Sequence, residues 1–206
     1  MTTDNYHDDD GLLFNKLGIS DPRELHEYDL LAGEIHAPAA LAYAEAQERL
    51  GMATLNGIHE ILFGELYEWA GRPRGVPLYK GESRFADPDH IEGWLDATMR
   101  QFERAVGTGD SEDDFRRFLG ELWGRLNWLH PYPEGNGRAT QIFVSAVALR
   151  YGYEIDWGMI ARSDELEAAR ESVTNRFGRY QRLLWQALHR INGGRTVTGH
   201  YPDRSR

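Results

Sequence analysis

Apolar residues recur at helical spacing along most of the chain, and this pattern predicts a protein built mainly from α-helices. The clearest run extends from Thr54 to Trp69, where the apolar side chains fall on one face of a helix. An earlier helix is expected from about Arg23 through Ile35, after the start signal Ser20-Asp21-Pro22. Pro38 is expected to break or kink that helix before residues 39–50.

Further helices are indicated in the second half of the chain. One should begin after Asp87-Pro88, and another should carry Phe115 to Leu129, because Ser111 and Asp114 approximate a capping box before it. A third should begin near Gly137. The last apolar pattern predicts either two helices or one helix interrupted near Gly178, over the ranges Asp164–Arg176 and Arg179–Ile191.

The stretch 74–87 has a different character, with Gly and Pro punctuating short apolar and aromatic pairs, and this predicts a short β-hairpin. Strands are otherwise scarce, so the expected fold class is all-α with one small hairpin. We expect one domain over residues 12–192. Residues 1–11 are acidic and are expected to be flexible, and residues 193–206 are expected to form a flexible tail because they lack an apolar pattern.

Composition narrows the classes of function. The chain has 206 residues, of which 41% are hydrophobic, which is enough for one sizeable core. It has no Cys, which excludes disulfides and thiolate metal sites and fits a cytoplasmic protein. A formal net charge of −10 disfavours direct binding to nucleic acid or to anionic membranes, and no segment is apolar enough to span a membrane.

The candidate chemistry lies in the nine residues His130 to Arg138, which join two predicted helices. Backbone N–H groups at a helix start are unpaired and favour an anion, and the glycines on either side of Asn136 let a ligand approach the backbone closely. Arg138 can add a fork of donors to the same anion. The loop is therefore interpreted as a cradle for a nucleotide phosphate.

Two further side chains complete this hypothesis. Glu134 offers an oxygen ligand for a hard cation such as Mg²⁺, which normally accompanies polyphosphate. His130, across the loop, can take a proton from an incoming nucleophile. Taken singly, a His-Pro turn, a Gly-Asn-Gly turn and a surface Arg each have ordinary structural explanations; their combination at this spacing favours the functional one.

The same stretch resembles the signature loop of Fic proteins, which reads His-x-Phe-x-(Asp/Glu)-Gly-Asn-Gly-(Lys/Arg)-x-x-Arg. Tyr132 stands where the pattern has Phe, and Gln141 stands where it ends in Arg. Residues 58–71 are similar to the Fic helix that precedes the active-site flap. The predicted hairpin is similar to that flap, whose pattern is matched by Lys80, Gly81 and Phe85.

This resemblance implies a Fic-type helical bundle that transfers AMP from ATP to a Tyr, Thr or Ser hydroxyl of a target protein. His130 would be the base, and Glu134 would position Mg²⁺. The α and β phosphates would lie on Asn136 and on the amides of Gly135 to Gly137, and Arg138 would bind the departing phosphates. The flap would hold the target segment by main-chain pairing. Gly137 argues against the phosphorylating branch of the family, which has Lys there.

The resemblance assigns position 141 to the terminal phosphate, and Gln141 lacks the charge that Arg would supply. A neutral hydrogen bond to phosphate is roughly half as strong as a charge-assisted one. Three outcomes follow: activity at reduced ATP affinity, a different preferred nucleotide, or nucleotide binding without efficient turnover. Weakened AMP transfer is favoured, and the alternative is a catalytically impaired Fic-fold module that binds nucleotide or protein.

Regulation is also implied by the resemblance. Many Fic proteins inhibit themselves through a helix with the pattern (Ser/Thr)-x-x-x-Glu-(Gly/Asn), and this sequence has no such segment, since Ala168 follows Glu167. It resembles the group in which a separate small antitoxin carries the inhibitory Glu helix. The hypothesis is therefore a bacterial toxin whose antitoxin docks a Glu near Arg138, with a type II topoisomerase subunit as the expected target.

Overall fold

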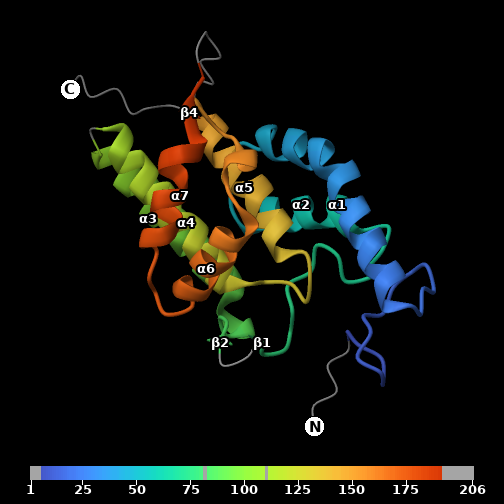
Figure 1. The fold of residues 1–206 in the computed structure, drawn as a ribbon. Helices are drawn as coiled ribbons and strands as arrows, with labels where there is room; N and C mark the ends of the chain where they lie inside the picture. The colour runs from blue at the N-terminus through green and yellow to red at the C-terminus, as the bar shows by residue number, and fades with distance from the viewer. Residues whose placement is uncertain (1–5, 81–82, 110, 192–206) are drawn as a thin grey trace.

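The computed structural model describes residues 6–80, 83–109 and 111–191, and helices account for most of them (Figure 1). The elements are α1 (Pro22–Glu45), α2 (Met52–Phe63), β1 (Tyr79–Lys80), β2 (Ser83–Arg84), η1 (Pro88–His90), α3 (Ile91–Thr108), α4 (Glu112–Leu129), α5 (Asn136–Arg150), β3 (Tyr153–Ile155), η2 (Trp157–Met159), α6 (Arg162–Ser172), α7 (Gly178–Ala187) and β4 (Leu188–Arg190). Within these ranges, no helix has both the length and the apolar character that crossing a membrane requires.

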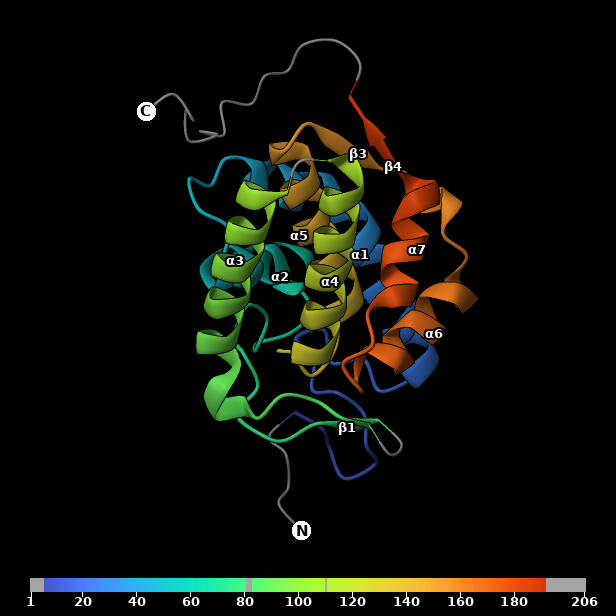
Figure 2. The same cartoon turned by 90° about the vertical axis from the view of Figure 1, so that its left-hand side faces the viewer.

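Helix α4 lies at the centre of the bundle and contacts α3, α5, α6 and α7, while α1 packs on α2 and α5. The antiparallel hairpin β1–β2 lies beyond the C-terminal end of α4, and the second small sheet, β3–β4, lies at the opposite end of the molecule (Figure 2). The expected fold class is confirmed, and the predicted hairpin is present. The end of the bundle that carries the hairpin also carries the loop between α4 and α5.

Helix α1 is a single helix that contains Pro38, so the expected alternative of a break is wrong. Its ribbon changes direction in its second half, in line with a kink (Figure 1). Asp21 caps the N-terminus by accepting hydrogen bonds from the backbone N–H groups of Arg23 and Glu24. Pro38 is exposed, so the backbone carbonyl that lacks a donor because of the proline can bind water. Beyond it, Ala40 and Ala44 are buried against the core, and this packing stabilises the second half of the helix.

Helix α2 ends at Phe63, whereas the periodic pattern predicted a helix to Trp69. The carbonyl of Phe63 accepts from the N–H groups of Leu66 and Tyr67, each at 2.9 Å, which closes a turn. Trp69 then stacks on Tyr67, with 4.4 Å between the ring centroids. The apolar residues after Gly64 are therefore buried in turns, and burial at helical spacing did not require them to be helical.

The sequence pattern did not predict the sheet β3–β4. Helix α7 ends at Ala187 instead of near Ile191, and the chain continues as a three-residue strand in which Leu188 pairs with Ile155 and Arg190 with Tyr153. Strands of this length show too few positions for an alternating pattern to be visible in sequence.

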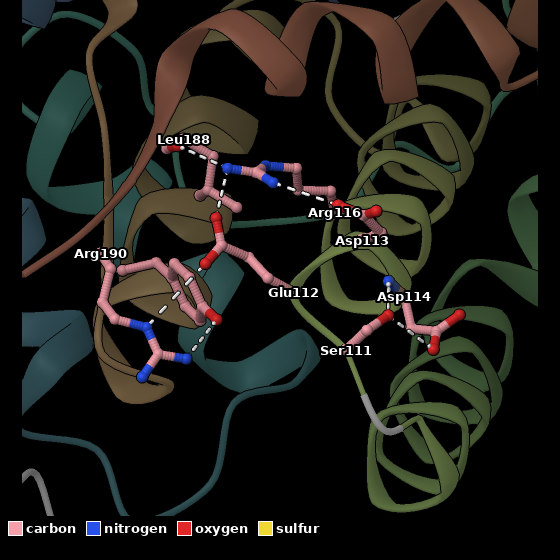
Figure 3. A network of polar contacts seen from close by, with 8 residues as sticks. Ser111, Glu112, Asp113, Asp114, Arg116, Leu188 and Arg190 are labelled. Atoms are coloured by element: carbon pink, nitrogen blue, oxygen red, sulfur yellow. Dashed lines mark hydrogen bonds and ion pairs between the residues drawn. The ribbon is translucent and has the colours of Figure 1, made fainter.

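A polar network connects the start of α4 to this second sheet (Figure 3). Ser111 caps α4 by accepting from the N–H of Asp114 at 3.1 Å, as its capping-box pattern predicted. Arg116 forms ion pairs with Glu112 and with Asp113, and it also donates to the carbonyl of Leu188 at 3.5 Å. The contacts anchor α4 at the end opposite to the His130 loop.

His59, in the middle of α2, links this helix to the loop that follows α4. Its Nδ1 accepts the N–H of Gly71 at 3.0 Å, so its Nε2 carries the proton and donates to the carbonyl of Glu134 at 3.0 Å. The ring is fully buried and stacks on Tyr132 at 3.8 Å. Burial lowers the pKa of His59 from 6.5 to about 3. A neutral, structural histidine therefore fixes the position of the loop.

This gives a prediction for stability against acid. Folded His59 stays neutral, whereas the unfolded side chain takes up a proton below pH 6.5, so stability is lost as the pH falls from 6.5 toward 3. Between pH 7 and pH 4 the loss attributable to His59 should be about 3 kcal/mol. In His59→Gln, the free energy of unfolding measured with urea should fall by about 3 kcal/mol less between pH 7 and pH 4 than it does in wild type. The exposed His189→Gln should behave as wild type, and equal pH dependence in all three proteins would contradict the assignment.

Candidate functional site

The loop that follows α4 begins with a residue in an unusual conformation. His130 caps α4 with φ 45° and ψ 61°, a left-handed conformation that helix ends usually give to Gly. Such a conformation costs of order 1–3 kcal/mol in a non-glycine residue and persists only where its surroundings impose it. Pro131 follows and prevents the helix from continuing. The result is a sharp reversal that carries an imidazole at its corner.

The imidazole of His130 is oriented by contacts on two sides. Its Nδ1 lies 3.2 Å from the carbonyl oxygen of Asn127, one turn back in α4, so a proton on Nδ1 can be donated there. In that tautomer Nε2 carries the lone pair that a general base uses. The ring of Phe85 stacks on the imidazole at 4.0 Å between centroids, and His130 is 8% exposed.

The middle of the loop is fixed by Asn136. Its side-chain Oδ1 accepts from the N–H of Tyr132 at 2.9 Å, and its Nδ2 donates to the carbonyl of Tyr132 at 2.7 Å. Asn136 is buried, and the Tyr132 hydroxyl donates to Asn56 at 2.8 Å. Burial raises the pKa of Tyr132. The asparagine side chain therefore shapes the loop from inside, and its backbone N–H is the group that belongs to the helix start.

Helix α5 begins at Asn136, one residue before the predicted start, and its N-cap Gly135 has φ 77°. A side chain at Gly135 would clash with the ring of Phe63, 2.4 Å from the added Cβ. At Gly137, which is exposed, no atom lies within 4 Å of an added Cβ. The amide-rich start of α5 is thus packed on one side and open on the other, which suits an approaching anion.

Glu134 lies just before this helix start. Its Oε1 accepts the N–H of Gly135 at 2.9 Å, and its carbonyl accepts from His59. The half-buried carboxylate is a suitable oxygen donor for Mg²⁺, which proteins commonly hold with one or two carboxylates together with substrate phosphates. Among the described residues there is no cluster of three or more His, Cys, Asp or Glu that could hold a metal by itself.

Arg138 does not project freely from α5. Its guanidinium forms an ion pair with the carboxylate of Asp29 in α1 and also donates to the Asp29 carbonyl. It also lies over the ring of Phe63, 4.6 Å from the centroid. Burial raises the pKa of Asp29, and the Arg138 cation acts in the opposite direction. Asp29 is only 4% exposed, so its carboxylate is shielded from water, whereas the side chain of Arg138 is 25% exposed.

Gln141 faces α6. Its Nε2 donates to Oε1 of Glu165 at 2.8 Å, and burial raises the pKa of that carboxyl, against the influence of Gln141 and Arg162. Position 141 therefore has a neutral donor engaged with an acidic side chain. An Arg at this position would have an ion-pair partner already in place.

Of the three residues predicted to dock the target, Lys80 and Phe85 belong to the described structure. Lys80 belongs to β1, which pairs with Ser83 of β2, and Gly81 lies outside the described residues. Phe85 is buried and packs on His130. The hairpin and the loop are thus in direct contact.

Two residues of the site had no place in the sequence interpretation. Asp29 repeats the buried spacing of Leu25 and Gly33 along α1, so an acidic residue on a core-facing position was a signal that could have been found. Arg74, buried between the hairpin and the loop, followed a Gly-Pro stop and gave no such signal.

Comparison with known proteins agrees with this geometry. Residues 49–148 match the Fic/DOC family. Protein adenylyltransferase VbhT of Bartonella schoenbuchensis is 34% identical over 83% of this chain and 36% of that protein, so the chain spans about a third of this relative. The probable protein adenylyltransferase Fic of Salmonella typhimurium is 32% identical over 71% of this chain and 72% of the relative.

The fold agrees as well. The N-terminal Fic domain of a VirB-translocated Bep effector protein from Bartonella quintana, solved with bound ADP, has a TM-score of 0.82 and 25% identity. The match covers 91% of this chain and 96% of that domain. With its signature loop between α4 and α5 and its hairpin against His130, the chain belongs to the Fic/DOC family.

Proposed function

We propose that this protein is an adenylyltransferase that transfers AMP from ATP to a hydroxyl side chain of a target protein. The observation that carries the proposal is the short junction of α4 and α5, which begins at His130 and leads into a helix start that is open at Gly137. The names of the relatives and the ADP bound to the Bartonella quintana domain support it. A cytoplasmic location is part of the proposal, because ATP is available there.

The reaction needs charge neutralisation and a base. The backbone N–H groups at the start of α5 would hold the phosphates, and Arg138 would contribute donors beyond those bound to Asp29. Nε2 of His130 would accept the hydroxyl proton while the oxygen attacks the α-phosphorus and the bond to the β-phosphate oxygen breaks, releasing pyrophosphate. Glu134 would hold Mg²⁺, whose charge offsets that of the phosphates when it is bound.

The hairpin would present the target to this base. Main-chain groups along a hairpin edge bind an extended segment without reading its sequence, so the hairpin sets the register of the acceptor and not its identity. The Phe85–His130 stack fixes the distance between the hairpin and the base. A type II topoisomerase subunit is the first target to test.

Mass spectrometry after incubation with Mg-ATP and candidate target proteins tests the proposal. Wild type should add one AMP to a Tyr, Thr or Ser, and His130→Ala should reduce the rate by roughly 100-fold or more, because it removes the base. The exposed His189→Ala should leave it unchanged. An adduct that persists at the wild-type rate in His130→Ala would refute the assigned role of His130.

A second candidate function is a nucleotide- or protein-binding module with impaired turnover, and the Gln141–Glu165 contact favours it. A neutral side chain already bound to a carboxyl offers the terminal phosphate less than an Arg would. An adduct that forms only in Gln141→Arg, and not in wild type, would establish this second function.

Nucleotide affinity gives a separate test of position 141. Replacing a neutral donor by a charged one should strengthen ATP binding by about 1 kcal/mol, or about fivefold. The gain in Gln141→Arg should be smaller than in the double variant Gln141→Arg/Glu165→Gln, because Glu165 competes with the phosphate for the new guanidinium. Isothermal titration calorimetry measures both, with the exposed Gln101→Arg on α3 as control. Equal affinity in all variants would mean that position 141 does not reach the phosphates.

We further propose that this protein is the toxin of a pair whose small antitoxin docks on α1. Large apolar side chains are exposed on this helix: Tyr28, Leu30, Leu31 and Ile35. Three of them, Tyr28, Leu31 and Ile35, share one stripe at helical spacing, flanked by the exposed Glu27 and Glu34. This pattern fits a partner helix with an apolar face and basic edges. Asp29, on the buried side of the same helix, accepts hydrogen bonds from Arg138 and so connects this surface to the loop.

The docking prediction is tested by recovery and inhibition. A tagged wild-type chain should retain one small protein in equimolar amount from its native cells, and that protein should suppress AMP transfer when added back. Leu31→Glu/Ile35→Glu should lose it, whereas Leu166→Glu, which alters an exposed apolar residue of α6, should retain it. If both variants recover the small protein equally well, it does not dock on the apolar stripe of α1.

A further inference from the structure

Arg74, in the segment between α2 and β1, is a buried cation that binds backbone carbonyls on both sides of the site. It is 2% exposed, and its Nε donates to the carbonyl of His130 at 2.8 Å. Its NH2 group donates to Ala86 at 2.6 Å and to Leu129 at 3.4 Å, and its NH1 group donates to Val76 at 2.7 Å. Burying a charge is costly unless it is hydrogen-bonded, and these carbonyls supply the bonds.

The acceptors on the loop side are consecutive in sequence. Besides the two carbonyls bound by its guanidinium, Arg74 donates its backbone N–H to the carbonyl of Pro131 at 2.7 Å. The carbonyls of Leu129 and His130 stand at the C-terminal end of α4, where the helix leaves its last carbonyls without partners and carries a negative partial charge. Arg74 therefore caps α4 and holds the reversal at His130 from three successive peptide units.

The acceptors on the hairpin side flank β1 and β2. Val76 precedes the hairpin and Ala86 follows it, and the N–H of Ala86 donates to the carbonyl of Trp128 at 3.2 Å. Phe85, which stacks on the imidazole of His130, directly precedes Ala86. One guanidinium thus joins the backbone of His130 to the segment whose aromatic ring covers the same imidazole.

We propose that Arg74 is the positioning residue of this site: it holds His130 in its left-handed conformation and fixes Phe85 against the imidazole. Arg74 donates to no group of the Gly135–Arg138 segment among its hydrogen bonds in the described structure, so it acts on the base and the hairpin and leaves nucleotide binding alone. The kinetic part of the proposal rests on the proposed function, because it takes His130 as the base; the conformational part does not.

The kinetic test separates positioning from binding. Arg74→Gln should lower kcat by roughly 10- to 100-fold, since small displacements of a catalytic group cost about this much. KM for ATP should stay within about twofold, because the phosphate-binding backbone is untouched. Arg74→Lys keeps the charge but not the fork of donors and should recover part of kcat.

The matched control is Arg150, at the far end of α5. It too donates to backbone carbonyls, those of Glu48 and Gln47, away from the loop. Arg150→Gln should lower the melting temperature yet leave kcat unchanged. If Arg74→Gln and Arg150→Gln lose kcat only in proportion to their loss of folded protein, Arg74 is structural and the proposal is wrong.

A second measurement does not depend on activity. In protein labelled with ¹³C at the histidine Cε1, the His130 signal, identified by its loss in His130→Asn, should carry a ring-current shift from Phe85. That signal should move or broaden in Arg74→Gln and in Arg74→Lys, and should stay in place in Arg150→Gln. Should Arg74→Gln not fold, Arg74→Lys carries both tests. An unmoved His130 signal in a folded Arg74 variant overturns the proposal, whether or not wild type transfers AMP.

Discussion

The reversal of the chain between α4 and α5 is the constraint on which the rest of the site depends. It brings the negative end of one helix and the positive end of the next to the same place, with His130 between them in a left-handed conformation. Such a turn is not stable by itself, and the surrounding contacts supply what the local sequence lacks. Arg74 neutralises the carbonyls of α4 on one side, and the amides of α5 remain open on the other.

The loop is stabilised from its interior by neutral groups. Asn136 binds both backbone groups of Tyr132, His59 donates to Glu134, and the rings of His59 and Tyr132 stack. Burial keeps the His59 imidazole uncharged and the Tyr132 phenol protonated, so their hydrogen bonds do not change across the pH range in which an exposed histidine titrates. His59 therefore serves the structure, and His130 is the histidine of the reversal to which the proposed function assigns the role of base.

Two polar side chains near the start of α5, Arg138 and Gln141, each bind a carboxyl on another helix. Arg138 is shared between α5 and Asp29 of α1, and Gln141 binds Glu165 of α6. Both contacts connect the N-terminal part of α5 to neighbouring helices, α1 and α6. A phosphate arriving at α5 would meet donors that are already oriented, which reduces the ordering required on binding, but it would also compete with two carboxyls.

The sequence by itself determined the mainly helical class, the hairpin at 74–87 and the loop at 130–138, because helical periodicity, turn residues and a dense motif are local properties of the chain. It did not determine where α2 ends, because burial at helical spacing continues through the turns up to Trp69. The pairing of β3 with β4 and the partners of Asp29, Arg74 and Glu165 join residues distant in the chain. Only the tertiary structure decides such contacts, because their strength comes from burial and from the alignment of helix ends, neither of which exists until the helices have packed.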